Sequence, residues 1–156
     1  MNEQSAVWVR ATSAGAISGR GLWPDWQEAW EMPKERVLII AEPGPLRDGL
    51  QALVGALPRV RPVERDDVES ALRNGHLEGE IALVLLDAGQ LGDGVGVALR
   101  SMKSKWPQAR YIALADDVRQ HHSALMAGVD IVLLKGFRPS RLAATIVRLL
   151  PPVQPE

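Results

Sequence analysis

The feature that most constrains the fold is a regular alternation of short apolar runs with longer amphipathic segments between residues 36 and 150. Short apolar runs are typical of buried strands, and apolar residues spaced three and four apart are typical of helices. The candidate strands are residues 36–41, 59–64, 81–86, 110–115 and 130–134. The candidate helices follow them in turn, at residues 45–57, 66–75, 95–106, 118–128 and 139–150. This alternation predicts a parallel sheet with helices on both faces.

The composition of the strands indicates their places in the sheet. Residues 81–86, with the sequence IALVLL, are apolar throughout and are typical of a strand that is covered on both faces. Pro62 lies within residues 59–64 and cannot donate a ladder hydrogen bond, which favours an edge position for that strand. We therefore expect an α/β fold, a three-layer, doubly wound, five-stranded parallel sheet of the flavodoxin-like type with strand order 2-1-3-4-5.

Composition and charge exclude several kinds of function. The chain has 156 residues and no cysteine, which excludes disulfides, thiolate metal sites and a cysteine nucleophile. Its net charge of −1 gives no general attraction to nucleic acid. No apolar run approaches the roughly 20 residues that span a bilayer, and the N-terminus lacks the pattern of a secretion signal. We expect a cytoplasmic protein that binds neither nucleic acid nor membrane.

The chain divides into a domain with an extension at each end. Residues 36–150 hold all the alternating elements, and residues 151–156 are a short tail. Residues 1–35 are an N-terminal extension whose predicted helix carries three tryptophans on one face: Trp23, Trp26 and Trp30. A face of this kind either packs on the same domain or meets a partner.

The topology also predicts where a site belongs. In doubly wound sheets, ligands bind at the carboxyl ends of the strands, beside the point where the strand order reverses. For the order 2-1-3-4-5 that point lies between the first strand, ending at Ala41 and Glu42, and the third, ending at Asp87. Lys135 follows the fifth strand and joins the same rim. Asp87 and Lys135 either belong to a functional site or form an ion pair that closes the crevice.

Three stretches of the domain resemble the receiver domains of bacterial response regulators. They are VLIIAEPGPLRDGL, LVLLDAGQLGDG and AGVDIVLLKGFRPSRLAATI, in the family's order and spacing. The resemblance covers residues 36–150 and implies a CheY-like domain of a two-component phosphorelay, which is not an enzyme. It implies that Asp87 accepts a phosphoryl group from a histidine kinase and that Lys135 holds the phosphoryl oxygens. It also implies that Glu42 and Asp87 are ligands for Mg²⁺.

The sequence departs from the family's pattern at several pocket positions. Ala41 stands where the first of two adjacent acids is expected, so we expect Mg²⁺ to bind weakly or not at all. The hydroxyl position falls on Ala115 or, in a different alignment, on Ala113. Val132 replaces the switch aromatic, and Gly136 replaces the proline after the lysine. Phosphorylation would therefore lack the usual donor and the usual moving ring.

Other titratable residues follow the fourth predicted strand. Asp116 and Asp117 lie close to its end, where they are either a substitute acid for the pocket or solvated loop residues. His121 and His122 are adjacent on a predicted helix and do not share a face, which argues against a metal site.

These departures favour a degenerate receiver, or pseudo-receiver, that acts through protein–protein interaction. Its partner would be a histidine kinase or a downstream signalling protein, or a second copy bound through the fourth and fifth helices. The alternative is a working single-domain response regulator, phosphorylated on Asp87 with Mg²⁺. A small enzyme or ligand-binding protein of the same fold is less favoured, since no base stands beside a nucleophile. If the chain is a fragment, it resembles the degenerate receivers of pilus-assembly ATPases of the TadZ/CpaE group.

Overall fold

The computed structural model describes residues 34–73 and 80–152 of the chain. The predicted tryptophan helix and residues 153–156 of the predicted tail lie outside these residues, so both stay predictions. Within the described residues, no helix is long and apolar enough to cross a membrane.

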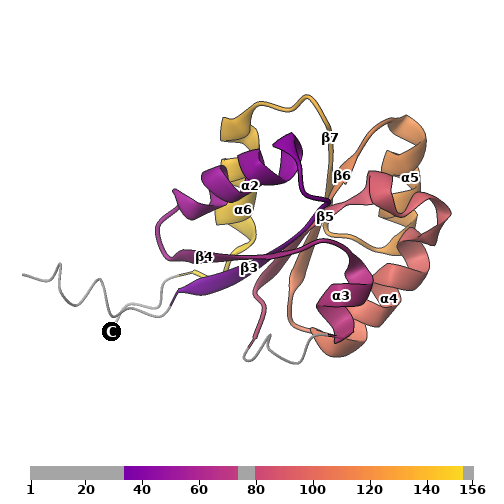
Figure 1. Ribbon diagram of the computed structural model, residues 1–156, viewed down its shortest axis with the longest axis horizontal. Coiled ribbons are helices and arrows are strands. Elements are labelled where there is room, and N and C mark those ends of the chain that lie inside the picture. The colour runs from indigo at the N-terminus through magenta and orange to yellow at the C-terminus, as the bar shows by residue number, and fades with distance from the viewer. Residues whose placement is uncertain (1–33, 74–79, 153–156) are drawn as a thin grey trace, which may run out of the picture. The chain divides into compact units, whose positions relative to one another are not determined.

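Five parallel strands form the sheet that the alternation predicts (Figure 1). They are β3 (Glu35–Ile40), β4 (Val60–Arg65), β5 (Leu83–Asp87), β6 (Arg110–Ala115) and β7 (Ile131–Leu134). Their order across the sheet is β4-β3-β5-β6-β7, which is 2-1-3-4-5 in chain order. The predicted fold class and strand order are confirmed, and the strand that carries Pro62 lies at an edge.

Helices cover both faces of the sheet (Figure 1). α2 (Pro45–Gly55) and α6 (Pro139–Leu149) lie together on one face. The other face carries α3 (Val68–Arg73), α4 (Val95–Lys105) and α5 (Val118–Ala127). Two short 3-10 turns, η2 (Ala88–Gln90) and η3 (Gly92–Gly94), connect β5 to α4. The carboxyl ends of the strands therefore face a rim of loops, which is where a site was expected.

Aspartate caps fix the start of two helices. Asp67 Oδ1 accepts a hydrogen bond from the Ser70 amide, 2.7 Å away, so α3 begins at Val68 and not at residue 66 as predicted. The same bond from the Ser70 backbone lowers the pKa of the Asp67 carboxyl. Asp117 Oδ1 accepts from the Gln120 amide at 2.8 Å and caps α5 in the same way.

The core consists of two apolar layers, one on each side of the sheet. Successive side chains of a strand point to opposite faces, so the central strands contribute to both layers. Leu83 and Leu85 of β5 pack beneath α2 and α6, whereas Val84 and Leu86 pack beneath the other three helices. Tyr111 lies in the second layer, where its hydroxyl donates to the carbonyl oxygen of Trp106 at 3.0 Å. The buried tyrosine therefore leaves no polar atom without a partner.

Gly128 ends α5 in the left-handed conformation, with φ of 100°. An alanine is strained in this region, and its Cβ would come 3.3 Å from Lys103 Nζ. We expect Gly128→Ala to lower the free energy of unfolding by about 1 kcal/mol, as measured by chemical denaturation.

The matched control for Gly128→Ala is the same substitution inside a helix. Gly96 lies in α4, and a Cβ added there would have open space around it. Gly96→Ala should therefore raise the free energy of unfolding by about 0.5–1 kcal/mol. A change of the same sign at both positions would contradict this account of the α5 terminus.

Candidate functional site

The candidate site begins with Asp87 at the carboxyl end of β5. The apolar strand buries four residues in the sheet and then delivers this carboxylate to the rim, where its side chain is 13% exposed. Asp87 also caps the turn η2, since its Oδ1 accepts a hydrogen bond from the Gly89 amide at 3.0 Å. The carboxylate is therefore held in place by its own loop.

Lys135 meets Asp87 from the end of β7. The Lys135 amide donates to the carbonyl oxygen of Ala115 at 2.8 Å, which extends the β6–β7 pairing by one residue. Its Nζ lies 2.7 Å from Asp87 Oδ1 and 2.6 Å from Asp116 Oδ1. The lysine thus joins two carboxylates that follow two different strands. The expected neighbourhood of Asp87 and Lys135 is found, and Asp116 is a third member.

Asp116 is held by Gln120 on the first turn of α5. The Gln120 side chain accepts a hydrogen bond from the Asp116 amide at 2.7 Å and donates to Asp116 Oδ2 at 3.3 Å. The Asp116 carboxylate lies directly over Gly89, so that a Cβ added to this glycine would collide with it. Sequence analysis missed Gln120, although an Asp four residues before a Gln, next to the helix cap at Asp117, is a recognisable pattern.

Electrostatics favours the charged forms of Asp116 and Lys135. The hydrogen bond from Lys135 is the main reason that the pKa of Asp116 is lowered. Burial acts to lower the pKa of Lys135, but the hydrogen bonds to Asp116 and Asp87 outweigh it, so this pKa is raised. Both shifts favour the charged forms, and at neutral pH Asp116 is ionised and Lys135 protonated.

The other predicted acid, Glu42, stands apart from this cluster. Its side chain is exposed, and in the described residues no hydrogen bond or ion pair joins it to Asp87. It lies on the rim of an opening whose other lining residues are Pro43, Asp66, Asp67, Gln90 and Leu91. The structure therefore brings Asp87 and Lys135 together but leaves Glu42 at the edge.

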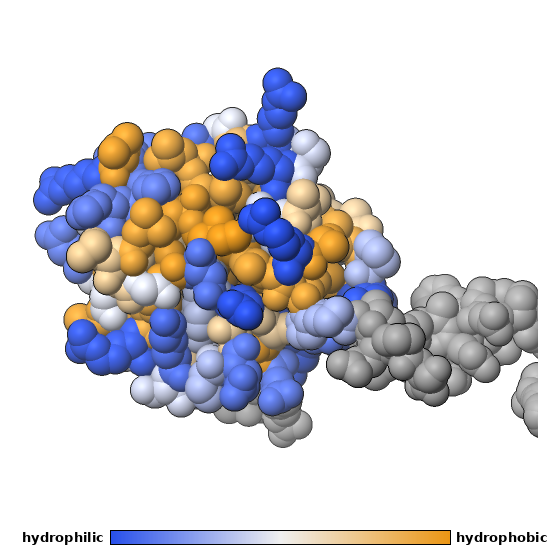
Figure 2. Space-filling model, turned by 180° about the vertical axis from the view of Figure 1, so that it is seen from behind, coloured by the Kyte–Doolittle hydropathy of each residue, from blue (hydrophilic) through white to orange (hydrophobic). Residues whose placement is uncertain are grey.

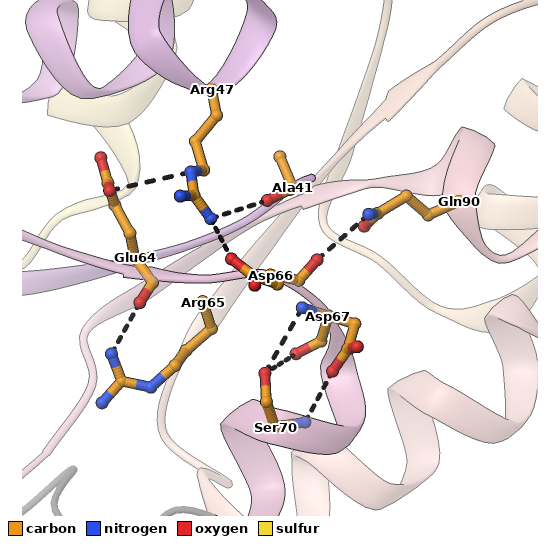
Figure 3. A network of polar contacts seen from close by, with 8 residues as sticks. All are labelled: Ala41, Arg47, Glu64, Arg65, Asp66, Asp67, Ser70 and Gln90. Atoms are coloured by element: carbon orange, nitrogen blue, oxygen red, sulfur yellow. Dashed lines mark hydrogen bonds and ion pairs between the residues drawn. The ribbon is translucent and has the colours of Figure 1, made fainter. Parts of the chain in front are cut away.

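Arg47 of α2 occupies the neighbourhood of the missing first acid (Figure 3). Its guanidinium donates to the carbonyl oxygen of Ala41 at 3.3 Å and to Asp66 Oδ1 at 2.5 Å. Glu64 Oε1 lies 3.7 Å from Arg47 Nε. The Gln90 side chain donates to the backbone carbonyl oxygen of Asp66 at 3.1 Å, which ties the loop after β5 to the loop after β4. A fixed positive charge thus stands at the end of β3.

The residues present do not fit a Mg²⁺ site. Mg²⁺ needs several oxygen ligands in octahedral geometry. Ala41 offers no side-chain oxygen, and Asp87 Oδ1 already accepts from an ammonium and an amide. Among the described residues, no three acidic or histidine side chains are grouped so as to hold a metal ion. That Glu42 and Asp87 bind Mg²⁺ weakly or not at all stays a prediction.

The remaining pocket positions carry small or aliphatic side chains. Ala113 and Ala115 are both fully buried in β6, so neither alignment gives the pocket a hydroxyl. Val132 is buried in β7, without an aromatic ring to move. Gly136 has φ of 97°, which proline cannot adopt, so the family's proline would not fit this backbone. His121 lies near Lys135 on the lining of one opening, whereas His122 is exposed.

Comparison with known proteins was made by sequence and by structure. No protein-family model matches the chain, and no curated protein matches it. A response regulator from Thermotoga maritima shares 15% identity and a TM-score of 0.64, over 74% of this chain and 97% of that chain. A LuxR family DNA-binding response regulator from Silicibacter pomeroyi shares 23% identity and a TM-score of 0.62, over 74% and 90%. The domain has the fold of a response regulator receiver.

The receiver fold also occurs in a protein assigned to pilus assembly from Burkholderia thailandensis. It shares 20% identity with this chain and a TM-score of 0.63, over 74% of this chain and 97% of that one. At such identities the likenesses establish the receiver fold and leave the activity to be argued from the site. Asp87 ends β5 and Lys135 follows β7, and their roles as phosphoacceptor and phosphoryl-binding lysine stay predictions.

Proposed function

We propose that this receiver-fold domain is a degenerate receiver of a two-component type of signalling system, acting by protein–protein interaction. In this proposal its phosphoacceptor pocket is filled by its own side chains, and phosphorylation of Asp87 is weak or absent. The single observation that carries the proposal is the position of Lys135, whose Nζ contacts Asp87 Oδ1 at 2.7 Å and Asp116 Oδ1 at 2.6 Å.

Phosphoryl transfer to Asp87 requires positive charge around the incoming group. Its oxygens carry negative charge that donors and cations must balance. Here Lys135 already balances two carboxylates, and Asp116 adds negative charge beside the acceptor. The poor ligand set for Mg²⁺ removes a second source of positive charge, and Arg47 is already paired with Glu64 and Asp66. Both features support a pocket that resists a phosphodonor.

The missing hydroxyl and the missing aromatic ring limit how phosphorylation of Asp87 could change the conformation of the domain. A phosphorylated Asp87 would find alanine at both candidate hydroxyl positions. It would also find Val132 where the family has a mobile aromatic. A ligand shifts a conformational equilibrium only through interactions that differ between the two states. The composition of the pocket therefore supports the proposal that the domain binds its partner independently of phosphorylation.

The partner in this proposal is a protein, either a histidine kinase or a downstream signalling protein. The contact surface lies on α5, β7 and α6, where Leu125, Met126 and Leu134 are exposed. A second copy is an alternative occupant. We place the protein in the cytoplasm. We give it no enzymatic activity, because among the described residues no base stands beside a nucleophile at the rim. The likeness to a protein assigned to pilus assembly suggests one setting for such docking.

Intact-mass spectrometry tests this proposal. The full chain is incubated with Mg²⁺ and acetyl phosphate, beside an Asp87→Asn variant and a receiver known to react with this donor. We expect the known receiver to gain a phosphoryl group and the wild-type chain to stay unmodified. A phosphoryl adduct on the wild-type chain that is absent from Asp87→Asn would overturn the proposal in favour of a working response regulator.

A further inference from the structure

The pocket around Asp87 contains an anion that belongs to the chain itself. Lys135 Nζ contacts Asp87 Oδ1 at 2.7 Å and Asp116 Oδ1 at 2.6 Å, so two carboxylates stand next to each other on one ammonium. Two like charges this close repel each other, and the shared cation offsets the repulsion. The Asp116 carboxylate therefore uses the contact with Lys135 that an external anion beside Asp87 would need.

Gln120 holds Asp116 in this position from the first turn of α5. The Gln120 side-chain oxygen accepts from the Asp116 amide at 2.7 Å, and its nitrogen donates to Asp116 Oδ2 at 3.3 Å. The cap of α5 does not require Asp116, because Asp117 Oδ1 already accepts from the Gln120 amide at 2.8 Å. Backbone and side chain of Asp116 are both held, which lowers the entropy that its carboxylate loses on contact with Lys135.

Gly89 provides the space for the Asp116 carboxylate. Its backbone conformation does not require glycine, since it is not one of the described glycines with a positive φ, which are Gly44, Gly92, Gly128 and Gly136. A Cβ at residue 89 would instead collide with Asp116 Oδ2 and would lie 3.1 Å from Asp87 Oδ1. The close approach of the two carboxylates is therefore what a side chain at this position would prevent.

We propose that Asp116 is a tethered anion that competes with phosphoryl groups and other external anions for Lys135, and that Gly89 makes this possible by leaving room for it. This inference rests on the proposed function, because it names the residue that closes the phosphoacceptor pocket. A group tethered next to its binding partner competes at an effective concentration on the order of mM or above. An anion in solution at a lower concentration does not displace it.

The competition between Asp116 and an external anion is reversible. The side chains of Asp116 and Lys135 are 47% and 28% exposed, so the carboxylate can turn into solvent when another anion takes its place. Neutralising Asp116 removes the competitor for Lys135 and also the repulsion between its charge and an incoming anion. Both effects have the same sign, and both open the pocket to a small anion.

Asp116 also connects the pocket to the start of α5. Gln120 contacts Asp116 and Asp117 alike, and Asp117 is the cap of the helix. Leu125 and Met126 of α5 are exposed. Figure 2, which turns the back of Figure 1 toward the reader, shows hydrophobic side chains gathered in the middle of the view with hydrophilic ones around them. The tethered anion keeps the first turn of α5 in one position whether or not a phosphodonor is present.

An NMR titration of the full chain with inorganic phosphate tests this inference. Phosphate is added at constant ionic strength, because salt screens contacts between exposed charges. The chemical shifts of the Lys135 and Gly136 amides report binding at the pocket. We expect Asp116→Asn to bind phosphate about tenfold more tightly than wild type, or tighter still. Adding Lys135→Met to Asp116→Asn should abolish this gain.

Gly89→Ala displaces the Asp116 carboxylate without changing the charge of the chain. The added Cβ meets the far end of a flexible side chain, which can move away. We expect phosphate binding to be tighter than in wild type, with a smaller gain than in Asp116→Asn because the acid stays nearby.

The matched control variant is Asp117→Asn. It removes the same charge one residue further along and keeps a side chain that caps helices well. Asp117 caps α5, and among the described residues no ion pair joins it to Lys135. Asp117→Asn should therefore bind phosphate with the affinity of the wild-type chain.

An Asp116→Asn variant that binds phosphate no more tightly than wild type would overturn the inference. An equal gain in Asp117→Asn would also count against it, because the effect would then come from net charge. Phosphate binding that survives Lys135→Met in the Asp116→Asn background would place the anion elsewhere. A folded Gly89→Ala variant without any gain would refute the role of Gly89. Asp116→Asn keeps the size of the side chain and decides the inference even if Gly89→Ala does not fold.

The two proposals fail separately. The titration contains no phosphodonor and forms no covalent bond. A phosphoryl adduct on Asp87 of the wild-type chain would overturn the degenerate-receiver proposal, whatever the ratio of the phosphate affinities. Equal phosphate affinities of wild type and Asp116→Asn, with Asp87 unmodified in the mass spectrometer, would overturn the tethered anion alone.

Discussion

Replacing Lys135 with methionine should lower the free energy of unfolding at neutral pH by about 2 kcal/mol, because charge-assisted hydrogen bonds are among the stronger polar contacts. Methionine keeps the apolar stem but leaves Asp87 and Asp116, which both contact the same Nζ, without a cation between them. Asp116 is 47% exposed, so solvent screens part of the repulsion, and we do not expect a larger loss. Urea denaturation at several pH values measures the effect.

The Lys135→Met prediction is most specific in how the free energy of unfolding should depend on pH. The pKa of Asp116 is lowered in the folded protein, so its stabilising contribution is present above its unfolded pKa and is lost as pH falls through the folded value. The pKa of Lys135 is raised, so its contribution is present below its unfolded pKa and is lost as pH rises through the folded value. The difference in the free energy of unfolding between wild type and Lys135→Met should therefore become smaller in acid and in strong alkali.

The control for this prediction places the same substitution in an Asp87→Asn/Asp116→Asn background. There the lysine has no carboxylate to balance, so its loss should be nearly neutral, and the difference between the two backgrounds gives the coupling energy. Two results would contradict it: Lys135→Met lowers the free energy of unfolding equally in both backgrounds, or by an amount that does not change with pH. Either result would show that Lys135 stabilises the fold through packing and not through its charge.

Leu85→Ala should be the most destabilising of the substitutions considered, at about 3 kcal/mol, since it deletes a fully buried side chain and leaves a cavity. Leu85 lies in the middle of β5, between Ile39 of β3 and Ile112 of β6. The neighbouring strands hold its backbone on both sides, so the core has little freedom to collapse into the space. Urea denaturation with comparison of midpoints measures the loss.

An exposed aliphatic residue provides the comparison for Leu85→Ala. Val147 on α6 is 58% exposed, so Val147→Ala should change the free energy of unfolding by no more than about 0.5 kcal/mol. A loss at Leu85 as small as that at Val147 would contradict the burial of β5 beneath α2 and α6.

The order of the sheet could be predicted from the sequence because the composition of a strand indicates its position in the sheet. β5 is apolar without alternation, and only a strand covered on both faces tolerates that pattern. β4 contains Pro62, which lacks a backbone donor, and it lies at an edge. Helix ends were predicted less well. The start of α3 depends on which polar residue caps it, and Asp66 and Asp67 are equally good candidates in the sequence.

The members of the candidate site could be predicted only where the course of the backbone alone determines the position of the residue. Asp87 ends β5 and Lys135 follows β7, and only β6 lies between these two parallel strands, so the topology brings both residues to one rim. The position of the Asp116 carboxylate depends on a side-chain conformation that Gln120 stabilises. The sequence alone could not decide whether Asp116 is an acid of the pocket or a solvated loop residue. Glu42 follows a buried alanine, and in an extended chain the next side chain points the other way.

Lys135 belongs to two parts of the molecule at once. Its Nζ joins Asp87 and Asp116, and the same residue lines an opening together with residues of α5, β7 and α6. A ligand in that opening that draws the Lys135 ammonium toward itself must weaken the contacts of the ammonium with the two carboxylates. By thermodynamic reciprocity, if such a ligand changes the affinity of a second ligand for Asp87 or Asp116 by some factor, that second ligand changes the affinity of the first by the same factor. The lysine would be a point of energetic coupling that needs neither a metal ion nor a moving ring.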